Sequence, residues 1–137
     1  MGTILQFRRS RAEESAWLLL RMYDEVLDAI DGAGSCIYAH DYPGKASHIS
    51  KAISIFHELT CSLDDRQDNL ARNLDSLYLT CTAKLVRASA YMNTEPLESA
   101  RIIIVRLRSA VADAIPSMPK NGKKARILPF SPMARHV

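Results

Sequence analysis

The sequence lacks any hydrophobic run long enough to cross a membrane. The longest uninterrupted apolar runs are Ala16 to Leu20 and Ile102 to Val105, whereas a helix that spans a bilayer needs about 20 apolar residues. The N-terminal arginines are followed by Glu13 and Glu14, where a secretory signal peptide would have an apolar stretch. We therefore expect neither membrane insertion nor secretion through a signal peptide.

Cysteine and glycine are too scarce for several common kinds of site. The three cysteines are far apart and include no Cys-x-x-Cys pair, which favours reduced thiols over a disulfide framework or a zinc site. Five glycines in 137 residues do not supply the glycine-rich loop that cradles a nucleotide phosphate. These absences predict a cytoplasmic protein that uses no cofactor.

Acidic residues are missing from the end of the chain, so the charge is divided unevenly. Residues 1–115 carry 13 basic and 15 acidic residues, a net charge of −2, and the residues after them carry +5. The same C-terminal stretch holds four of the six prolines, a composition typical of an extended segment that does not pack. We expect one domain over residues 12–115, a flexible N-terminal segment over residues 1–11 and a disordered basic tail over residues 116–137.

Apolar residues recur at spacings of three and four along the domain, which predicts amphipathic helices. Four helices are expected. The first covers about residues 12–31 and ends at Gly32 and Gly34, and the second covers about residues 43–63. The third begins near Asp68, and the fourth begins with Thr94 as its cap and Pro96 in its first turn.

Four helices of roughly 20 residues are each about 30 Å long. Their connections are under a dozen residues, and short connections favour antiparallel neighbours. The predicted fold is therefore all-α, an antiparallel up-and-down four-helix bundle with an extended N-terminal segment.

Two of these helices carry more apolar residues than a narrow core stripe needs. Ile102 to Val105 follow one another in the fourth helix, and Ile55 and Leu59 stand beside the apolar seam of the second. Consecutive apolar residues point around more than half of a helix, so some of them lie outside the stripe. Either a wide core or a partner covers them. We take Ile55, Leu59, Ile102 and Val105 as candidate binding residues.

The sequence shows no catalytic or metal-binding pattern. A two-metal bundle needs Glu-x-x-His pairs, and no histidine here has a glutamate three residues before it. Phosphate-loop, zinc-protease and serine-nucleophile motifs are missing as well. Cys61 lies four residues after His57, but a buried cysteine at a helix seam is common. We expect no enzyme activity and no bound metal.

Short motifs in the first and third predicted helices resemble those of the FliS family of flagellin export chaperones. The segment Leu18–Asp24 resembles that family's L-x-x-x-L-Y-D stretch. Ser62–Asp64 and Leu70–Tyr78 resemble its S-L-D and I-A-x-N-L-x-x-L-Y motifs, in the same order and with similar spacing. The resemblance covers most of the chain. Departures from the family's pattern are Glu14-Ser15 for Ser-Pro, Glu25 for glycine, Gln67-Asp68 for Gly-Gly and Val111 for tryptophan.

The resemblance implies a cytosolic helical bundle that binds the disordered C-terminal segment of flagellin. Such a protein blocks premature filament assembly and delivers flagellin to a component of the flagellar export gate. The motifs add Tyr23, Asn73 and Tyr78 to the candidate client-binding residues, and Phe7 is expected to lie over the client surface when that surface is empty. No cofactor is implied, and the free protein is expected to be a monomer or a weak homodimer.

A helical regulatory protein whose basic tail contacts RNA or DNA is the alternative function. Five basic residues with Phe130 as the one aromatic residue among them are a weak pattern for such contacts, so nucleic acid is not an expected partner. Salt dependence separates the two functions, because phosphate-driven binding falls steeply with salt whereas burial of apolar surface changes little.

Overall fold

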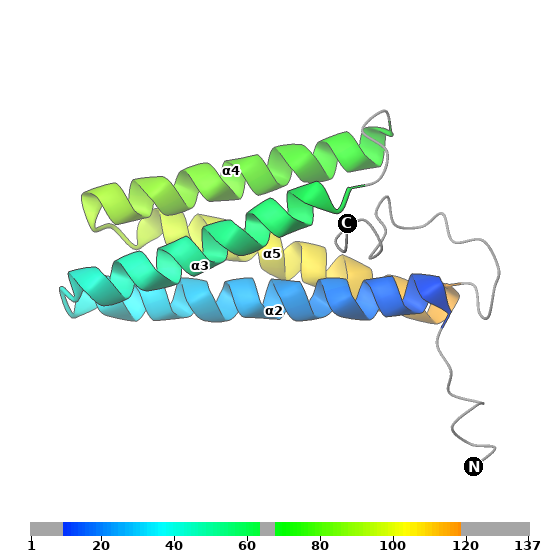
Figure 1. The fold of residues 1–137 in the computed structure, drawn as a ribbon, viewed down its shortest axis with the longest axis horizontal. Coiled ribbons are helices and arrows are strands. Elements are labelled where there is room, and N and C mark those ends of the chain that lie inside the picture. The colour runs from blue at the N-terminus through cyan, green and yellow to red at the C-terminus, as the bar shows by residue number, and fades with distance from the viewer. Residues whose placement is uncertain (1–9, 64–67, 119–137) are drawn as a thin grey trace, which may run out of the picture.

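The computed structural model describes residues 10–63 and 68–118. The helices are α2 (Arg11–Tyr38), α3 (Tyr42–Cys61), α4 (Asn69–Tyr91) and α5 (Glu95–Ala114), followed by a short 3-10 helix, η1 (Ile115–Ser117). Figure 1 shows the four long helices running alternately in opposite directions along the bundle. None of the helices in this part of the chain has the length and hydropathy that a membrane span requires.

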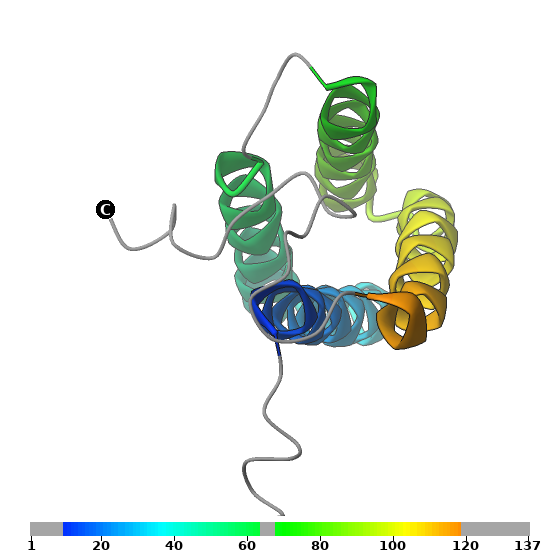
Figure 2. The ribbon, with the colours of Figure 1, turned by 90° about the vertical axis from the view of Figure 1, so that its right-hand side faces the viewer.

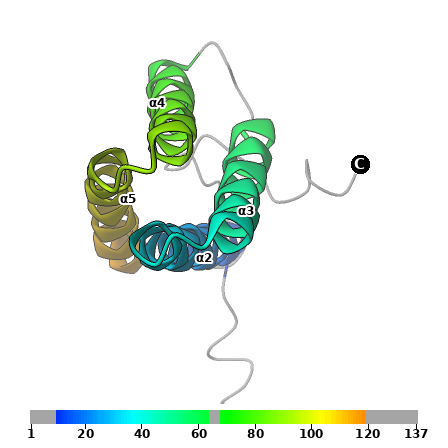
Figure 3. The ribbon, with the colours of Figure 1, turned by 90° about the vertical axis from the view of Figure 1, so that its left-hand side faces the viewer.

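The four long helices pack in a ring. Helix α2 contacts α3 and α5, and α4 contacts the same two helices, as the two end-on views show (Figures 2 and 3). Helices α2 and α4 therefore face each other across the bundle. This arrangement confirms the predicted all-α, four-helix bundle with antiparallel neighbours.

Side chains cap the first turns of three helices. At the start of α2, Ser10 and Glu13 form a capping box, in which each backbone N–H donates to the other's side-chain oxygen at 3.2 Å. Asp41 and Asp68 cap α3 and α4, and each accepts a hydrogen bond from a first-turn N–H, at 3.0 and 2.9 Å. These bonds satisfy donors that have no partner within the helix. The predicted start of the third helix near Asp68 is confirmed.

Helix α5 begins where predicted, but a different residue caps it. Thr94 occupies the N-cap position without a side-chain capping bond. The Asn93 side-chain oxygen accepts the N–H of Glu95 at 3.0 Å instead. Pro96 lies in the first turn, where its missing N–H costs no hydrogen bond.

The predicted end of the first helix at Gly32 and Gly34 is wrong, because α2 continues to Tyr38. A Cβ added at Gly32 would lie 2.5 Å from the His48 ring of α3, whereas one at Gly34 would lie 3.8 Å from Leu97 of α5. The missing side chain at Gly32 thus makes room for a neighbouring helix. Glycine inside a helix costs about 1 kcal/mol of stability relative to alanine. Packing between the helices outweighs this cost at Gly32.

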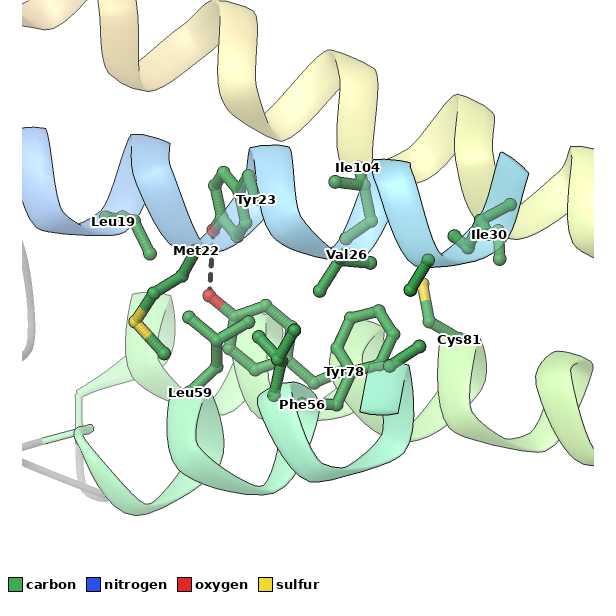
Figure 4. Close-up of a cluster of buried hydrophobic side chains, with 14 of the residues drawn as sticks. Leu19, Met22, Tyr23, Val26, Ile30, Phe56, Leu59, Tyr78, Cys81 and Ile104 are labelled. Atoms are coloured by element: carbon green, nitrogen blue, oxygen red, sulfur yellow. Dashed lines mark hydrogen bonds between the residues drawn. The ribbon is translucent and has the colours of Figure 1, made fainter. Parts of the chain in front are cut away.

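The core runs the length of the bundle, and Figure 4 shows a cluster of it that receives side chains from all four helices. Its largest fully buried residues are Val26, Tyr23, Phe56, Leu59, Tyr78, Cys81, Leu85 and Ile104. At the C-terminal side, Met118 also packs into the core, three residues beyond the predicted domain boundary. Ser10 and Arg11 of the predicted flexible segment belong to the start of α2, and Pro116 and Ser117 of the predicted tail lie in η1. Residues 1–9, which include Phe7, and residues 119–137 lie outside the described residues, and there the flexible segment and the basic tail stay predictions.

Replacing Gly34 by alanine is expected to stabilise the fold by about 0.5–1 kcal/mol, because alanine favours the helix and the new methyl group meets only an ordinary contact. The melting temperature should rise by a few degrees. Gly32→Ala is the matched control, since it gains the same propensity but must displace the His48 ring. An equal rise in both variants would contradict the packing role of Gly32.

Candidate functional site

Tyr23 and Tyr78, two of the residues singled out by the motifs, meet at the centre of the bundle. Their hydroxyl oxygens are 2.8 Å apart and hydrogen-bonded (Figure 4), and the two side chains are completely buried. The Phe56 ring of α3 packs against Tyr78, with the ring centroids 6.0 Å apart. The hydrogen bond joins α2 to α4, which are opposite each other in the ring of helices.

Burial raises the pKa of both tyrosines. Loss of hydration is the main cause, and it raises the pKa of Tyr78 to about 12. For Tyr23, the interaction with Tyr78 adds to desolvation and raises the pKa well above its ordinary value. Desolvation also raises the pKa of the nearby Cys81 thiol to about 11. All three groups are therefore neutral at physiological pH, and the centre of the bundle carries no charge.

A buried pair of hydroxyls has a structural consequence. A hydroxyl buried without a partner costs about 1–3 kcal/mol, so each tyrosine requires the other at one position and orientation. The pair thus fixes α4 relative to α2. Neither ring reaches the surface, and the part of Tyr23 and Tyr78 in client binding stays a prediction.

The structure divides the other candidate residues into a buried and an exposed group. Ile55 and Leu59 of α3 are buried in the core. For these two residues, the wide core is therefore the correct one of the two alternatives. Ile102 and Val105 of α5 are 44% and 37% exposed, and Asn73 is exposed on α4. Of the apolar candidates within the described residues, the two on α5 are the ones accessible to a partner in this conformation.

Two ion pairs on either side of Val105 hold α5 against α2. Arg101 donates to Asp31 at 3.1 Å, and Arg108 donates through two nitrogens to the carboxylate of Asp24. Both pairs are partly exposed, so each contributes no more than about 1 kcal/mol. Because the arginines and the aspartates are each seven residues apart, the pairs fix the register of the two antiparallel helices.

The exposed side of α4 carries an apolar stripe that the sequence analysis missed. Leu79 and Val86 are 61% and 53% exposed and, seven residues apart, they share one face of the helix. Lys45 of α3 donates to the carbonyl of Ser89 at 3.0 Å, one turn beyond Val86, so this side of α4 borders α3. Residues 76–91 contain no acidic residue.

Helix α3 adds small and apolar side chains on its side away from α2. His48 faces α2 through its contact with Gly32, and Ala46, Ser50 and Ile53 lie on the opposite side of α3. We call the combined surface the α3–α4 face; it comprises Ala46, Ser50, Ile53, Leu79, Ala83 and Val86, of which Ile53 is partly buried and the others are exposed.

The sequence did contain a pattern that could have revealed this face. Leu79 and Val86 directly follow the buried residues Tyr78 and Leu85, so a second apolar stripe with the same seven-residue period runs beside the core seam. Two adjacent stripes on one helix exceed what a single core face needs. The second stripe therefore marks an apolar surface that the four helices leave exposed.

The described residues contain no metal-binding cluster. Among residues 10–63 and 68–118, no three His, Cys, Asp or Glu side chains are placed to hold a metal ion. Cys61 and His57 do meet, with Sγ 3.6 Å from Nε2, at the exposed end of α3. The exposed aliphatic residues of α4 and α5 are instead of the kind that makes apolar contact with another chain.

Comparison with known proteins identifies a family. The family model described as flagellar protein FliS matches residues 9–118, a range that includes all four long helices. No curated protein matches the chain.

Replacing one of the paired tyrosines is expected to destabilise the protein more than replacing both. Tyr23→Phe leaves the Tyr78 hydroxyl buried without a partner, at a cost of about 1–3 kcal/mol, whereas Tyr23→Phe/Tyr78→Phe removes both hydroxyls. Urea denaturation of the wild type, both single variants and the double variant measures the coupling. If the double variant loses as much free energy of unfolding as the two single variants together, the result would contradict a hydrogen bond between the two hydroxyls.

The raised pKa of Tyr78 predicts a loss of stability in strong base. An unfolded tyrosine ionises near pH 10, whereas folded Tyr78 ionises near pH 12. Its stabilising contribution is complete below pH 10 and is lost as the pH rises through 12. Between these two pH values, the melting temperature should fall less steeply with pH in Tyr23→Phe/Tyr78→Phe than in the wild type. Equal slopes would show that the pair does not titrate in this way.

Proposed function

Because the chain belongs to the FliS family of flagellar export chaperones, we propose that its client is flagellin and that it binds the disordered C-terminal segment of flagellin. In the cytoplasm, the bound segment is kept from joining a filament too early. The chaperone then delivers the subunit to a component of the flagellar export gate.

The observation that carries this proposal is the apolar surface that the bundle leaves exposed. Leu79 and Val86 on α4, and Ile102 and Val105 on α5, are large aliphatic side chains open to solvent. An amphipathic client segment buries its own apolar residues when it lies along such helices. The small side chains of the α3–α4 face allow a client helix to approach closely.

The energetics favour a moderate affinity. Covering a few exposed aliphatic side chains contributes several kcal/mol, at about 25 cal/mol per Å² of apolar surface. A disordered client loses about 2–5 kcal/mol of this when it becomes ordered. The remainder suits a chaperone, since the client must be released at the export gate.

The buried candidates support the same surface from within. Tyr78 directly precedes Leu79 in α4, so the hydrogen bond to Tyr23 holds Leu79 and Val86 on the outside of the bundle. Ile55 and Leu59 pack in the core and hold α3 in the bundle. Asn73 is exposed on α4, where it is available to hydrogen-bond the client.

The purified protein is expected to bind full-length flagellin and to lose binding when flagellin lacks its C-terminal segment. Titration calorimetry with the two forms of flagellin measures the difference. Equal affinity for both, or no binding to either, would refute the proposal.

Surface variants identify the residues that receive the client. Leu79→Ser/Val86→Ser and Ile102→Ser/Val105→Ser should each weaken flagellin binding about tenfold or more, a loss of about 1.4 kcal/mol or more, with little change in melting temperature. Leu59→Ser is the buried control and should instead lower the melting temperature by many degrees. Tyr38→Ser, which removes an exposed ring elsewhere, should leave flagellin binding intact. Unchanged binding in both double variants would exclude these faces as the client surface.

A further inference from the structure

The one tryptophan of the sequence borders an open groove between α2 and α5. Trp17 is 42% exposed. The groove has a volume of about 460 Å³, and it is lined by Trp17, Leu18, Leu20, Arg21 and the ion pair of Asp24 with Arg108. We call it the Trp17 groove. An exposed indole ring beside leucines is apolar surface that the four helices leave uncovered.

Carboxylates outnumber cations on the outer side of α2, which borders the groove. Glu14, Glu25 and Asp28 are exposed there, at spacings that place them on the same side of the helix as Trp17. Arg21, also on this side, offsets one of the three charges. The ion pairs that join α2 to α5 use other aspartates. Helix α4, by contrast, carries three basic residues and one acidic residue. A positively charged segment is therefore attracted to the outer side of α2 and not to α4.

The chain itself supplies such a segment close to the groove. Met118, the last residue that the structure describes, is buried in the core and follows η1 at the end of the bundle where α2 begins (Figures 1 and 2). Residues 119–137 contain five basic and no acidic residues, and they include the apolar group Ile127–Phe130.

This apolar group is within reach of the Trp17 groove. Ile127 follows Met118 by nine residues, which span up to about 30 Å when extended. Trp17 lies six residues from the start of α2, which is about 9 Å along the helix. The prolines among residues 119–137 favour extended backbone, and an extended segment suits an open groove between two helices.

We propose that residues 119–137 bind back on the outer side of α2, with Ile127–Phe130 in the Trp17 groove. The Phe130 ring packs against Trp17, an aromatic contact that buries apolar area on both sides. Lys123 and Lys124 precede the apolar group, and they face the carboxylates that flank the groove.

The carboxylates lie at a suitable distance for this arrangement. Glu14 and Glu25 are three and eight residues from Trp17, or about 5 and 12 Å along the helix axis. Lys123 and Lys124 are four and three residues from Ile127, or about 10–13 Å of extended chain. Charges at these separations attract one another, because the screening length is about 10 Å at 0.1 M salt.

The tether makes a weak contact sufficient. A short connection gives the tail an effective concentration of about 1 mM. A contact with a Kd of about 0.1 mM between separate molecules therefore keeps the tail bound about 90% of the time.

Charge also separates the tail from the other segment of the chain outside the described residues. Residues 1–9 contain Phe7 and adjoin the start of α2, but they carry two basic residues against five in the tail. The attraction to the outer side of α2 is therefore stronger for the tail.

The bound tail leaves the α3–α4 face open. Helix α4 is opposite α2 in the ring of helices, so Leu79 and Val86 stay accessible while the tail lies on α2. The tail contact is therefore independent of the proposed function.

Fluorescence of Trp17 tests the proposal, because no other tryptophan contributes to the signal. Acrylamide quenching is compared between the full-length protein and full-length Ile127→Ser/Phe130→Ser. We expect the quenching constant to be about twofold or more higher in the variant, since a tail bound about 90% of the time covers the ring. The melting temperature of the helices should not change.

Phe7→Ser is the matched control, because it removes an apolar side chain from the other end of the chain. Its quenching constant should equal that of the wild type. Unchanged quenching in Ile127→Ser/Phe130→Ser overturns the proposal. So does an increase confined to Phe7→Ser, since residues 1–9 would then occupy the groove.

An exchange of charges tests the electrostatic part. Glu25→Lys/Asp28→Lys should release the tail and raise the quenching constant, and addition of Lys123→Glu/Lys124→Glu to the same chain should restore protection. Failure to restore it overturns the proposed path of the tail. Protection of Trp17 that increases with protein concentration overturns the proposal as well, because the tail of a second copy would then be the occupant.

Discussion

A hydrogen bond between two buried hydroxyls ties together the two helices that are opposite each other in the ring. Apolar side chains of similar volume can replace one another in a core at modest cost, so apolar packing alone tolerates a small rotation of a helix. A buried hydroxyl does not, because it loses its partner and no water replaces it. The bond between Tyr23 and Tyr78 thus specifies one orientation of α4 against α2, and with it the side chains that α4 presents to solvent.

Charge has a similar role at the surface, between α2 and α5. Two ion pairs join these helices, Asp24 with Arg108 and Asp31 with Arg101. They add little stability, but both can form only in one register of the two helices. The bundle therefore takes its stability from apolar burial and its alignment from a few polar pairs. Such a division leaves the exposed faces free to carry apolar residues without loss of a unique fold.

The apolar period of the sequence was sufficient to predict four helices and their arrangement, since burial follows the helical repeat directly. It was not sufficient at Gly32, because glycine both ends helices and admits close neighbours, and only the position of His48 on another helix decides between these roles. Similarly, Ile55 and Leu79 both stand beside a core seam, yet one is buried and the other exposed. Which side of a seam is covered depends on the neighbouring helices, and the sequence of one helix does not contain that information.

A small bundle with exposed aliphatic residues has an alternative, in which a helix turns to bury them. Rotation of α4 by one residue position, about 100°, would bring Leu79 toward the core in place of Tyr78. The Tyr23 hydroxyl would then remain buried without a partner, while Tyr78 would move out of the core. Apolar packing could accept that exchange, since leucine and tyrosine both fill a core, but the buried hydroxyl opposes it. The polar pair at the centre of the bundle is therefore what keeps an apolar face on the outside, available to the proposed client.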